Sequence, residues 1–489
     1  MSNLTEDLPI KHVSGRLIAI IAAAVLAVVG IGIGTESWWL AGLPFGLALV
    51  WVTIIHFKSI YFLLMASIPL STEMELPGGF GTDFISEPLM WLLTLAGGLW
   101  LIRHGSRVDG RFLRHPITLV LLVHLVWTAI TVIFSEDFGV SIKFFLAKGW
   151  YIAVFFFLTG RFLGKEEDIK KMIWWFFTPL VLTVLIILLR HSGKGFSFET
   201  INSVLSPFYR NHVMYACIMA VFIPFIWYAT YWYNRWSLLW WILVAGIIVL
   251  LVGINFAYTR AAYGALVASV VVSIVVKLRA MRLALLFTTL LFGLFIAFVS
   301  YKDNWLLFAP DYERTVTHTR FESLLEATTR LEDISLMERV YRWVAASQMI
   351  KDKPFMGFGP GNFYFFYKNY TVNSFRTYVS DNPERSGMHN YYLMIAVEQG
   401  LPGVFLFIGL CFFTMIQGQR IYKAQQDLWK RRMALAALLC FVLIIVLMLM
   451  NDLVETDKIG SLFFISLAIL VNMDINARNV STGSDNLPD

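Results

Sequence analysis

The chain has 489 residues, of which 58% are hydrophobic, 16% are aromatic and only 15% are charged. Ordinary soluble domains contain roughly 45–50% apolar and 25% charged residues, so this composition excludes a set of soluble domains and indicates a membrane protein. The formal net charge of +6 is too small to argue for nucleic-acid binding, and no nucleic-acid partner is expected.

Apolar runs long enough to cross a bilayer recur along the chain. A spanning helix needs about 20 mostly apolar residues. On that measure we count about fourteen runs, and the third and last are so short that each could be re-entrant. We therefore predict an all-α, polytopic membrane helix bundle with about 12–14 spans. The runs lie near residues 16–34, 38–56, 59–71, 84–102, 116–134, 142–162, 172–190, 212–230, 237–256, 261–277, 282–300, 402–417, 432–451 and 459–472.

Positive charge is confined to alternate loops between these runs. By the positive-inside rule such loops face the cytoplasm, so we expect both termini to be cytoplasmic and the acidic loops between them to face outward. The basic residues of the four loops are Arg103, Arg107, Arg111 and Arg114; Arg161, Lys165, Lys170 and Lys171; Lys277, Arg279 and Arg282; and Arg420, Lys423, Lys430, Arg431 and Arg432.

The three cysteines, Cys217, Cys411 and Cys440, all lie within apolar runs. Neither a disulfide framework nor a cysteine metal cluster is therefore expected. No Asp-x-Asp pair stands out in the outer loops, so we expect no metal and no cofactor.

A long polar segment divides the chain. About 88 residues separate the eleventh run from His389, whereas a typical connection has about 4 to 6 residues. We therefore expect an N-terminal transmembrane bundle (1–300), a partly helical extracytoplasmic loop region (301–388), C-terminal transmembrane helices (389–475) and a cytoplasmic tail (476–489).

Within the loop region, ISLMERVYRWVAASQMI predicts a helix that stops before Pro354, with Ser335 as N-cap and Glu338 as its capping-box partner. The following FMGFGPGNF predicts a tight glycine turn; a phosphate cradle is the alternative, weakened because Pro360 removes a backbone donor. The aromatic run FYFFYKNY indicates interfacial anchoring rather than a sugar platform, since Tyr and Trp favour the membrane boundary.

The polar residues that look chemical all fall on the outer side. Arg210 and Arg260 lie at the starts of apolar runs, His389 lies where the loop region meets the membrane, and Asp452 and Glu455 lie in a later outer loop. A guanidinium at the membrane edge can hold phosphate oxygens in two-pronged fashion, although snorkelling to head groups is the alternative. For His389 the alternatives are a catalytic base and a boundary histidine bonded to backbone.

A histidine base beside arginines suggests a defined reaction. An acceptor hydroxyl would lose its proton and attack a sugar C1, while a lipid diphosphate departs and the arginines stabilise its charge. Because diphosphate is already a good leaving group, no strong general acid is needed.

Three segments resemble, in order, the O-antigen ligase and polymerase family of lipid-linked polysaccharide transferases. They are TRAAYGALV, RVYRWVAASQMIKDKPFMGFGPGNF and HNYYLMIAVEQGLPG, and PFYRNHVMYA resembles a fourth segment less distinctively. The third segment is the most specific, because His389 and Asn390 are followed by nine residues and then by Gly400 and Gly403.

The resemblance implies a metal-independent, inverting glycosyltransferase of the bacterial cytoplasmic (inner) membrane. Its donor would be an undecaprenyl-diphosphate-linked glycan, its acceptor a lipid or a glycan, and its active site would face the periplasm among membrane lipids. His389 would be catalytic, Arg210, Arg260 and Arg339 would bind the diphosphate, and the motif residues Asn390, Gly400 and Gly403 would support them. The family usually has twelve spans, so our count departs from its pattern.

The acceptor separates two close alternatives. A ligase would use lipid A core and an O-antigen or exopolysaccharide polymerase would use a glycan repeat; the His-Asn element favours the ligase. A flippase or other transporter of lipid-linked sugars is the third alternative. Against it, the buried ionisable candidates are few, mainly His124, Lys148 and Glu398, and no internal repeat is evident.

Overall fold

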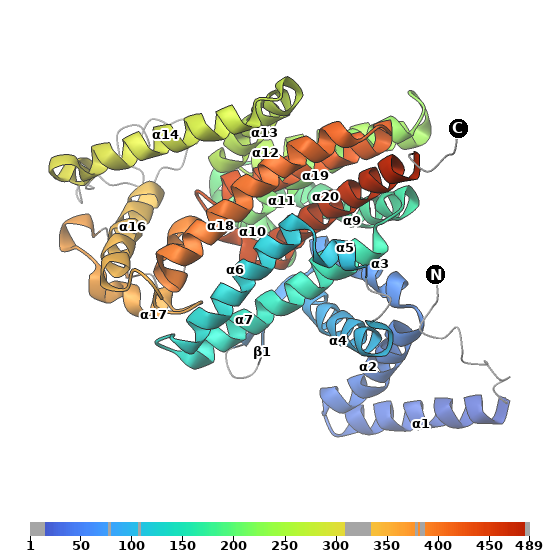
Figure 1. Ribbon diagram of the computed structural model, residues 1–489. Coiled ribbons are helices and arrows are strands. Elements are labelled where there is room, and N and C mark those ends of the chain that lie inside the picture. The colour runs from blue at the N-terminus through green and yellow to red at the C-terminus, as the bar shows by residue number, and fades with distance from the viewer. Residues whose placement is uncertain are drawn as a thin grey trace.

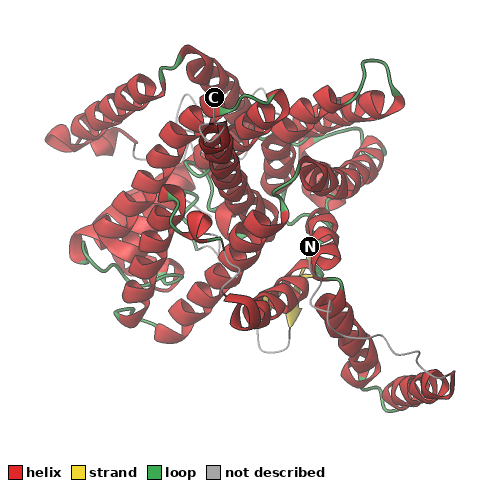
Figure 2. Ribbon diagram, turned by 45° about the vertical axis from the view of Figure 1, so that its right-hand side comes forward, coloured by secondary structure: helices red, strands yellow, loops and turns green. Residues whose placement is uncertain are grey.

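The computed structural model describes residues 15–76, 80–105, 109–308, 334–376, 380–381 and 387–484. It confirms the predicted all-α polytopic bundle, since one two-stranded hairpin is the only sheet in these residues (Figures 1 and 2). Before the long loop the helices are α1 (Gly15–Gly34), α2 (Trp38–Ile55), α3 (Phe57–Ser67), α4 (Ser86–His104), α5 (Gly110–Leu113), α6 (Pro116–Ile133), α7 (Phe138–Ile152), α8 (Thr159–Phe162), α9 (Glu166–Ser192), α10 (Ile201–Val204), α11 (His212–Ala229), α12 (Leu238–Phe256), α13 (Arg260–Leu278) and α14 (Met281–Ser300). After it come α16 (Ile334–Asp352), α17 (Phe363–Phe366), α18 (Tyr391–Ala424), α19 (Leu428–Leu447) and α20 (Asp457–Ser484).

Short helical turns join these elements. A π-helical segment, η3 (Ala153–Leu158), makes α7 and α8 one continuous helix. The remaining turns are η1 (Ile68–Leu70), η4 (Phe198–Thr200), η5 (Thr230–Trp232), η6 (Tyr301–Phe308), η7 (Tyr367–Tyr370), η8 (Asn373–Phe375) and η9 (Leu453–Glu455).

Within the described residues, nine helices are long and apolar enough to cross a membrane, and a bent pair brings the number to ten. The bent pair joins Gly42–Ile55 to Phe57–Leu70 at 119°, so the short third run belongs to a broken span or a re-entrant loop. The predicted count of about fourteen is higher, partly because we counted run 432–451, whose helix α19 carries Lys430, Arg431 and Arg432 near its start. The last run is longer than predicted, since the candidate span in α20 reaches from Asp457 to Arg478 and the helix continues to Ser484.

The core of the bundle is formed by helices that are apolar on every side. The apolar window of α20 is 89% buried and that of α11 is 72% buried, against 6% for α14. A helix that is hydrophobic all round needs protein or lipid on all faces, so α11, α19 and α20 lie inside while α14 lies at the edge (Figure 1). Cys217, Cys411 and Cys440 are buried free thiols, as predicted.

The four basic loops meet at one end of the bundle, which we call the basic end. His115 bonds Asp474 there at 3.1 Å, and Gln425 Nε2 donates to the Met473 carbonyl at 2.9 Å. Further contacts there join Asn472 to the Gly160 and Leu163 carbonyls, the Met281 amide to Gln419 and the Arg432 guanidinium to the Tyr231 ring. Alternate loops therefore share one end, as the charge pattern predicts.

A small hairpin caps the opposite end. β1 (Thr72–Leu76) pairs with β2 (Phe80–Phe84) in antiparallel register, Thr72 opposite Phe84. The Asp457 carboxylate, at the start of α20, accepts hydrogen bonds from the hydroxyls that flank the hairpin, Ser71 at 2.5 Å and Ser86 at 2.6 Å. The acidic segment that we expected as an outer loop is therefore an ordered hairpin tied to the bundle core.

The described part of the loop region has a core of its own. α16 ends at Asp352, before Pro354 as predicted. The predicted capping box is wrong, because Ser335 lies inside α16 and the Glu338 carboxylate accepts from Ser380 Oγ at 2.6 Å. In the aromatic run, Phe363 and Tyr367 are buried against α16 and Phe365 is 54% exposed, so this run mainly fills the loop core rather than anchoring at an interface or stacking sugars.

Helix α18 breaks at Gly400, whose backbone is left-handed (φ 70°, ψ 179°). A break inside an apolar bundle leaves backbone carbonyls that must find other donors. Each carbonyl before the break has one: Val397 accepts from the Phe358 amide at 2.9 Å, Glu398 from the Gly359 amide at 2.8 Å, and Gln399 from Trp127 Nε1 at 2.9 Å. After the break, the Leu401 amide donates to the Pro354 carbonyl at 2.7 Å.

The glycine turn is the part of the loop that docks on this break. Gly357, Gly359 and Gly361 all have positive φ, and a Cβ at Gly359 would lie 2.1 Å from Ser135 Cβ. Because the Phe358 and Gly359 amides already bond α18, the turn has the structural role that we favoured over a phosphate cradle.

Gly400→Ala tests this docking. The substitution puts an alanine at a positive φ and places its Cβ 2.0 Å from the Phe355 carbonyl oxygen. We expect this strain and clash to lower the free energy of unfolding by at least about 2 kcal/mol. Thermal unfolding of the purified chain in detergent measures the effect. Gly409→Ala, in open space on the same helix, is the control and should leave the melting temperature unchanged. Equal melting of both variants would contradict the docking.

Candidate active site

His389 lies at the end of the loop region, two residues before α18, with left-handed backbone (φ 56°). Its neighbour Asn390 caps α18, accepting from the Leu393 amide at 3.0 Å and donating through Nδ2 to the Leu449 carbonyl at 3.1 Å. The Tyr391 amide donates to the Met448 carbonyl at 2.9 Å. These bonds fix the backbone on which the imidazole is carried.

Helix α16 brings two arginines to His389. Arg339 and Arg342 are three residues apart, so they share a face of the helix. Arg342 Nη1 donates to the Gly387 carbonyl at 2.6 Å, and Trp343 Nε1 donates to the Met388 carbonyl at 3.2 Å. The chain leading to His389 is therefore attached directly to the arginine-bearing helix.

Burial and nearby positive charge keep His389 uncharged. Burial, the larger cause, and the positive charges of Arg339 and Arg342 together lower the pKa of the imidazole from 6.5 to about 3. At neutral pH the imidazole is therefore uncharged and one ring nitrogen is free of a proton. A neutral imidazole can accept a proton from a hydroxyl.

Arg210 and Arg260 flank a neighbouring junction of the bundle. Arg210 precedes α11 and pairs with Glu73 of the hairpin at 3.5 Å. Arg260 opens α13, directly after Thr259, whose hydroxyl donates to the His212 carbonyl at 3.3 Å. His212 in turn interacts electrostatically with Arg339, the same side chain that acts on His389.

Asp452 completes the link between these groups. Its half-buried carboxylate lies against Gly387, where a Cβ would be 2.0 Å from Oδ2. Burial raises the pKa of Asp452, and the charges of Arg342 and Arg210 oppose the rise. Arg210 and Arg342 thus act on the same carboxylate, that of Asp452, beside the His389 segment. Arg260 is placed near this region through its chain neighbour Thr259, which bonds the His212 carbonyl.

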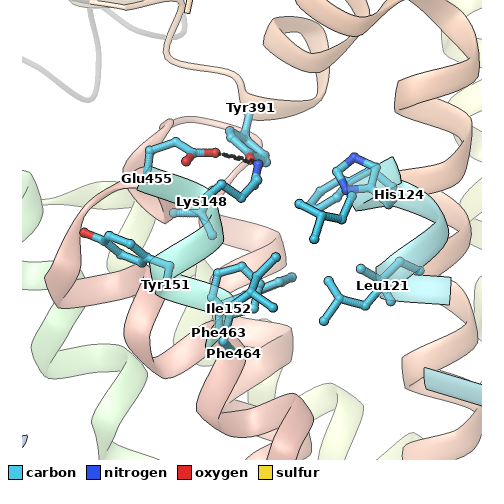
Figure 3. A pocket seen from close by; sticks show the side chains of 13 residues that line it. Leu121, His124, Lys148, Tyr151, Ile152, Tyr391, Glu455, Phe463 and Phe464 are labelled. Atoms are coloured by element: carbon cyan, nitrogen blue, oxygen red, sulfur yellow. Dashed lines mark hydrogen bonds and ion pairs between the residues drawn. The ribbon is translucent and has the colours of Figure 1, made fainter. Parts of the chain in front are cut away.

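A buried ionic network lies just beyond His389, at the start of α18. Lys148 Nζ is 3.0 Å from Tyr391 Oη and 3.1 Å from Glu455 Oε1, and Tyr391 also bonds Glu455 (Figure 3). Across a cavity of about 20 Å³ lies His124, whose Nε2 has no hydrogen-bond partner among the described residues (Figure 3). This volume holds about one water molecule, so the cavity supports the site rather than receiving a sugar.

Sequence reasoning missed Arg342 and the Lys148–Tyr391–Glu455 network. The spacing of three from Arg339 on a predicted helix was a usable signal for Arg342. No local signal pairs Lys148 with Glu455, because 307 residues separate them. No group of three or more His, Cys, Asp or Glu side chains that could hold a metal ion occurs in the part of the chain that the structure describes.

Residues 245–408 match the family described as O-antigen ligase. Over this part, the chain is similar to the O-antigen ligase family. The match confirms the predicted resemblance and includes Arg260, Arg339 and His389 together with the whole His-Asn and Gly-x-x-Gly element; Arg210 precedes it. No curated protein shows a significant sequence match to the chain.

Similarity to the O-antigen ligase family indicates a general type of enzyme activity and a location in the membrane. Its members are glycosyltransferases of the ligase and polymerase type in polysaccharide biosynthesis, and this chain has the multiple apolar helices of a multi-pass membrane protein. Lipid-linked glycans and acceptors in the membrane are the substrates that the family implies.

The titration of His389 tests the site's electrostatics. Arg339→Gln removes one positive charge, so the pKa of His389 should rise above its wild-type value of about 3 but stay below 6.5, because burial, the larger cause, remains. NMR of histidine-labelled protein measures this, with the signal assigned by its loss in His389→Gln. Arg376→Gln, an exposed loop arginine paired with Asp381, should leave the pKa unchanged. An unshifted pKa in Arg339→Gln would place Arg339 away from His389.

Proposed function

We propose that the chain is an inverting glycosyltransferase that moves a glycan from undecaprenyl diphosphate to an acceptor hydroxyl, in the manner of an O-antigen ligase with lipid A core as acceptor. One observation carries the proposal: the half-buried His389 lies next to the charges of Arg339 and Arg342, which with burial lower its pKa, in the segment that matches O-antigen ligases. A base kept neutral beside fixed positive charges suits a reaction in which a hydroxyl is deprotonated while an anion departs.

The arginines would hold the donor diphosphate. The three arginines come from different elements: Arg210 lies just before α11, Arg260 opens α13 and Arg339 lies in α16. Guanidinium groups stay charged and bind phosphate oxygens in two-pronged fashion. The diphosphate would then sit where its developing charge is stabilised as the C1–oxygen bond breaks.

Donor binding would also activate the base. Without a bound anion, the positive charges of Arg339 and Arg342 help to lower the pKa of His389. A bound diphosphate cancels part of their charge, so the pKa of His389 should rise in the complex. The imidazole then takes the acceptor proton as the acceptor oxygen bonds C1 from the face opposite the diphosphate, which leaves with the bonding electron pair. The proton is later lost to water.

The charge pattern supports an orientation. The basic end, which joins His115 to Asp474 and Gln425 to Met473, would face the cytoplasm together with both termini. The His389 site at the other end would then face the periplasm across the inner membrane. No metal is needed in this scheme, because the arginines supply the positive charge.

A transporter fits these contacts less well. Lys148 pairs with Glu455 and Tyr391, and the Glu398 carboxylate accepts from the Phe363 amide at 3.2 Å. These ionisable groups therefore hold elements together rather than line a substrate path. A polymerase shares the proposed donor and base and differs in using a glycan repeat as acceptor.

Measuring glycan transfer by the His389→Ala variant tests the proposed base directly. With purified chain, lipid-linked glycan and lipid A core, the variant should lose at least about 99% of transfer, within the range of rate losses expected for a general base, while donor remains unconsumed. A chelator should leave wild-type transfer unchanged.

Two further variants test the specificity of this result and the role of Arg260. Arg376→Gln is the control and should transfer at the wild-type rate. Arg260→Lys, which keeps the charge and loses the two-pronged geometry, should weaken donor use. Transfer to glycan repeats but not to lipid A core would show that the chain is a polymerase rather than a ligase. Glycan transfer retained by His389→Ala would show that His389 is not the general base.

A further inference from the structure

A second pocket lies at the basic end, and the proposed reaction does not use it. It has a volume of about 450 Å³ and is lined by the α5 and α6 starts and the end of α20. Its lining residues are Asp109, Gly110, Arg111, Arg114, His115, Pro116, Ile475 and Arg478.

The pocket and the His389 site are at opposite ends of the same helices. α6 begins at the pocket with Pro116 and ends near Glu136, whose amide donates to the Phe358 carbonyl of the glycine turn at 3.0 Å. An 18-residue helix is about 27 Å long, close to the thickness of a bilayer's hydrocarbon core. The pocket therefore belongs to a different membrane surface from the site.

The polar groups of the pocket leave a positive charge in excess. Arg111 pairs with Asp109 at 2.8 Å, and Arg478 pairs with Asp474 at 2.6 Å. The exposed Arg114 has no side-chain partner among the described residues. Three guanidinium groups thus surround a cavity that has two carboxylates at its edge, a charge balance that favours an anion.

An apolar stripe runs from the pocket along α6. Leu119, Val123 and Val126 are 48%, 52% and 60% exposed, and their spacing of four and three residues places them on one face of the helix. The stripe begins three residues after Pro116, which lines the pocket. A charged cavity that continues into a lipid-facing stripe has the form of a phospholipid, with a head group and acyl chains.

We propose that this pocket binds the phosphate head group of an anionic phospholipid, with the acyl chains along the Leu119–Val126 face of α6. Basic pockets between membrane helices at their polar ends suit such head groups. The His115–Asp474 bond joins α6 to α20 beside the cavity, so a lipid bound here would clamp these two helices together. The inference is independent of the proposed transfer reaction.

Lipid-dependent stability of the purified full chain tests the site. In detergent, phosphatidylglycerol should raise the melting temperature of the wild type, whereas phosphatidylcholine and inorganic phosphate should not. Arg114→Gln should weaken the phosphatidylglycerol effect by about tenfold in lipid concentration, the loss of one charge-assisted contact. Because Arg114 is exposed, its removal should leave the lipid-free melting temperature unchanged.

Two further variants complete the test. Arg282→Gln removes an exposed arginine elsewhere at the basic end and should respond to lipid as the wild type does. Val123→Asn should weaken the lipid effect through the acyl chains. If phosphatidylglycerol raised the melting temperatures of Arg114→Gln and the wild type equally, the proposed site would be wrong. If inorganic phosphate alone raised the melting temperature, the ligand would be a free anion rather than a lipid. If phosphatidylcholine raised it equally, the pocket would not select an anionic head group, which would also contradict the proposal.

Discussion

The structure depends on how α18 satisfies its backbone where it breaks. At Gly400 the helical hydrogen bonds are interrupted inside an apolar bundle, where unpaired carbonyls are costly. The glycine turn and Trp127 supply the missing donors. This exchange attaches the loop region to the bundle by main-chain bonds, so the loop has one defined position on the membrane helices.

That position brings the candidate site together. With the turn fixed, α16 lies beside the end of the loop region, where Arg342 and Trp343 bond the chain just before His389. Asn390 then starts α18 as its N-cap. One segment of fifteen residues, from His389 to Gly403, therefore carries both the proposed base and the break on which the arginine-bearing loop region docks.

Much of this was predictable from sequence, and what was not involves distant pairing. Hydrophobic runs gave the helices, and the residues around Gly400 and His389 gave the family. The end of helix α16 before Pro354 was predicted, but its capping box was not, because Glu338 bonds Ser380, which lies 42 residues away in the chain. Periodicity places residues on helix faces and does not pair one helix with another, so the Lys148–Glu455 contact stayed hidden.

Hydrogen exchange of the backbone amides in the full-length chain tests the docking most directly. The amides of Phe358, Gly359 and Leu401 bond across the break, so we predict that they exchange as slowly as amides inside α18. Exchange of these three amides at the rate of exposed loop amides would contradict the account, because the loop would then have no fixed position beside His389.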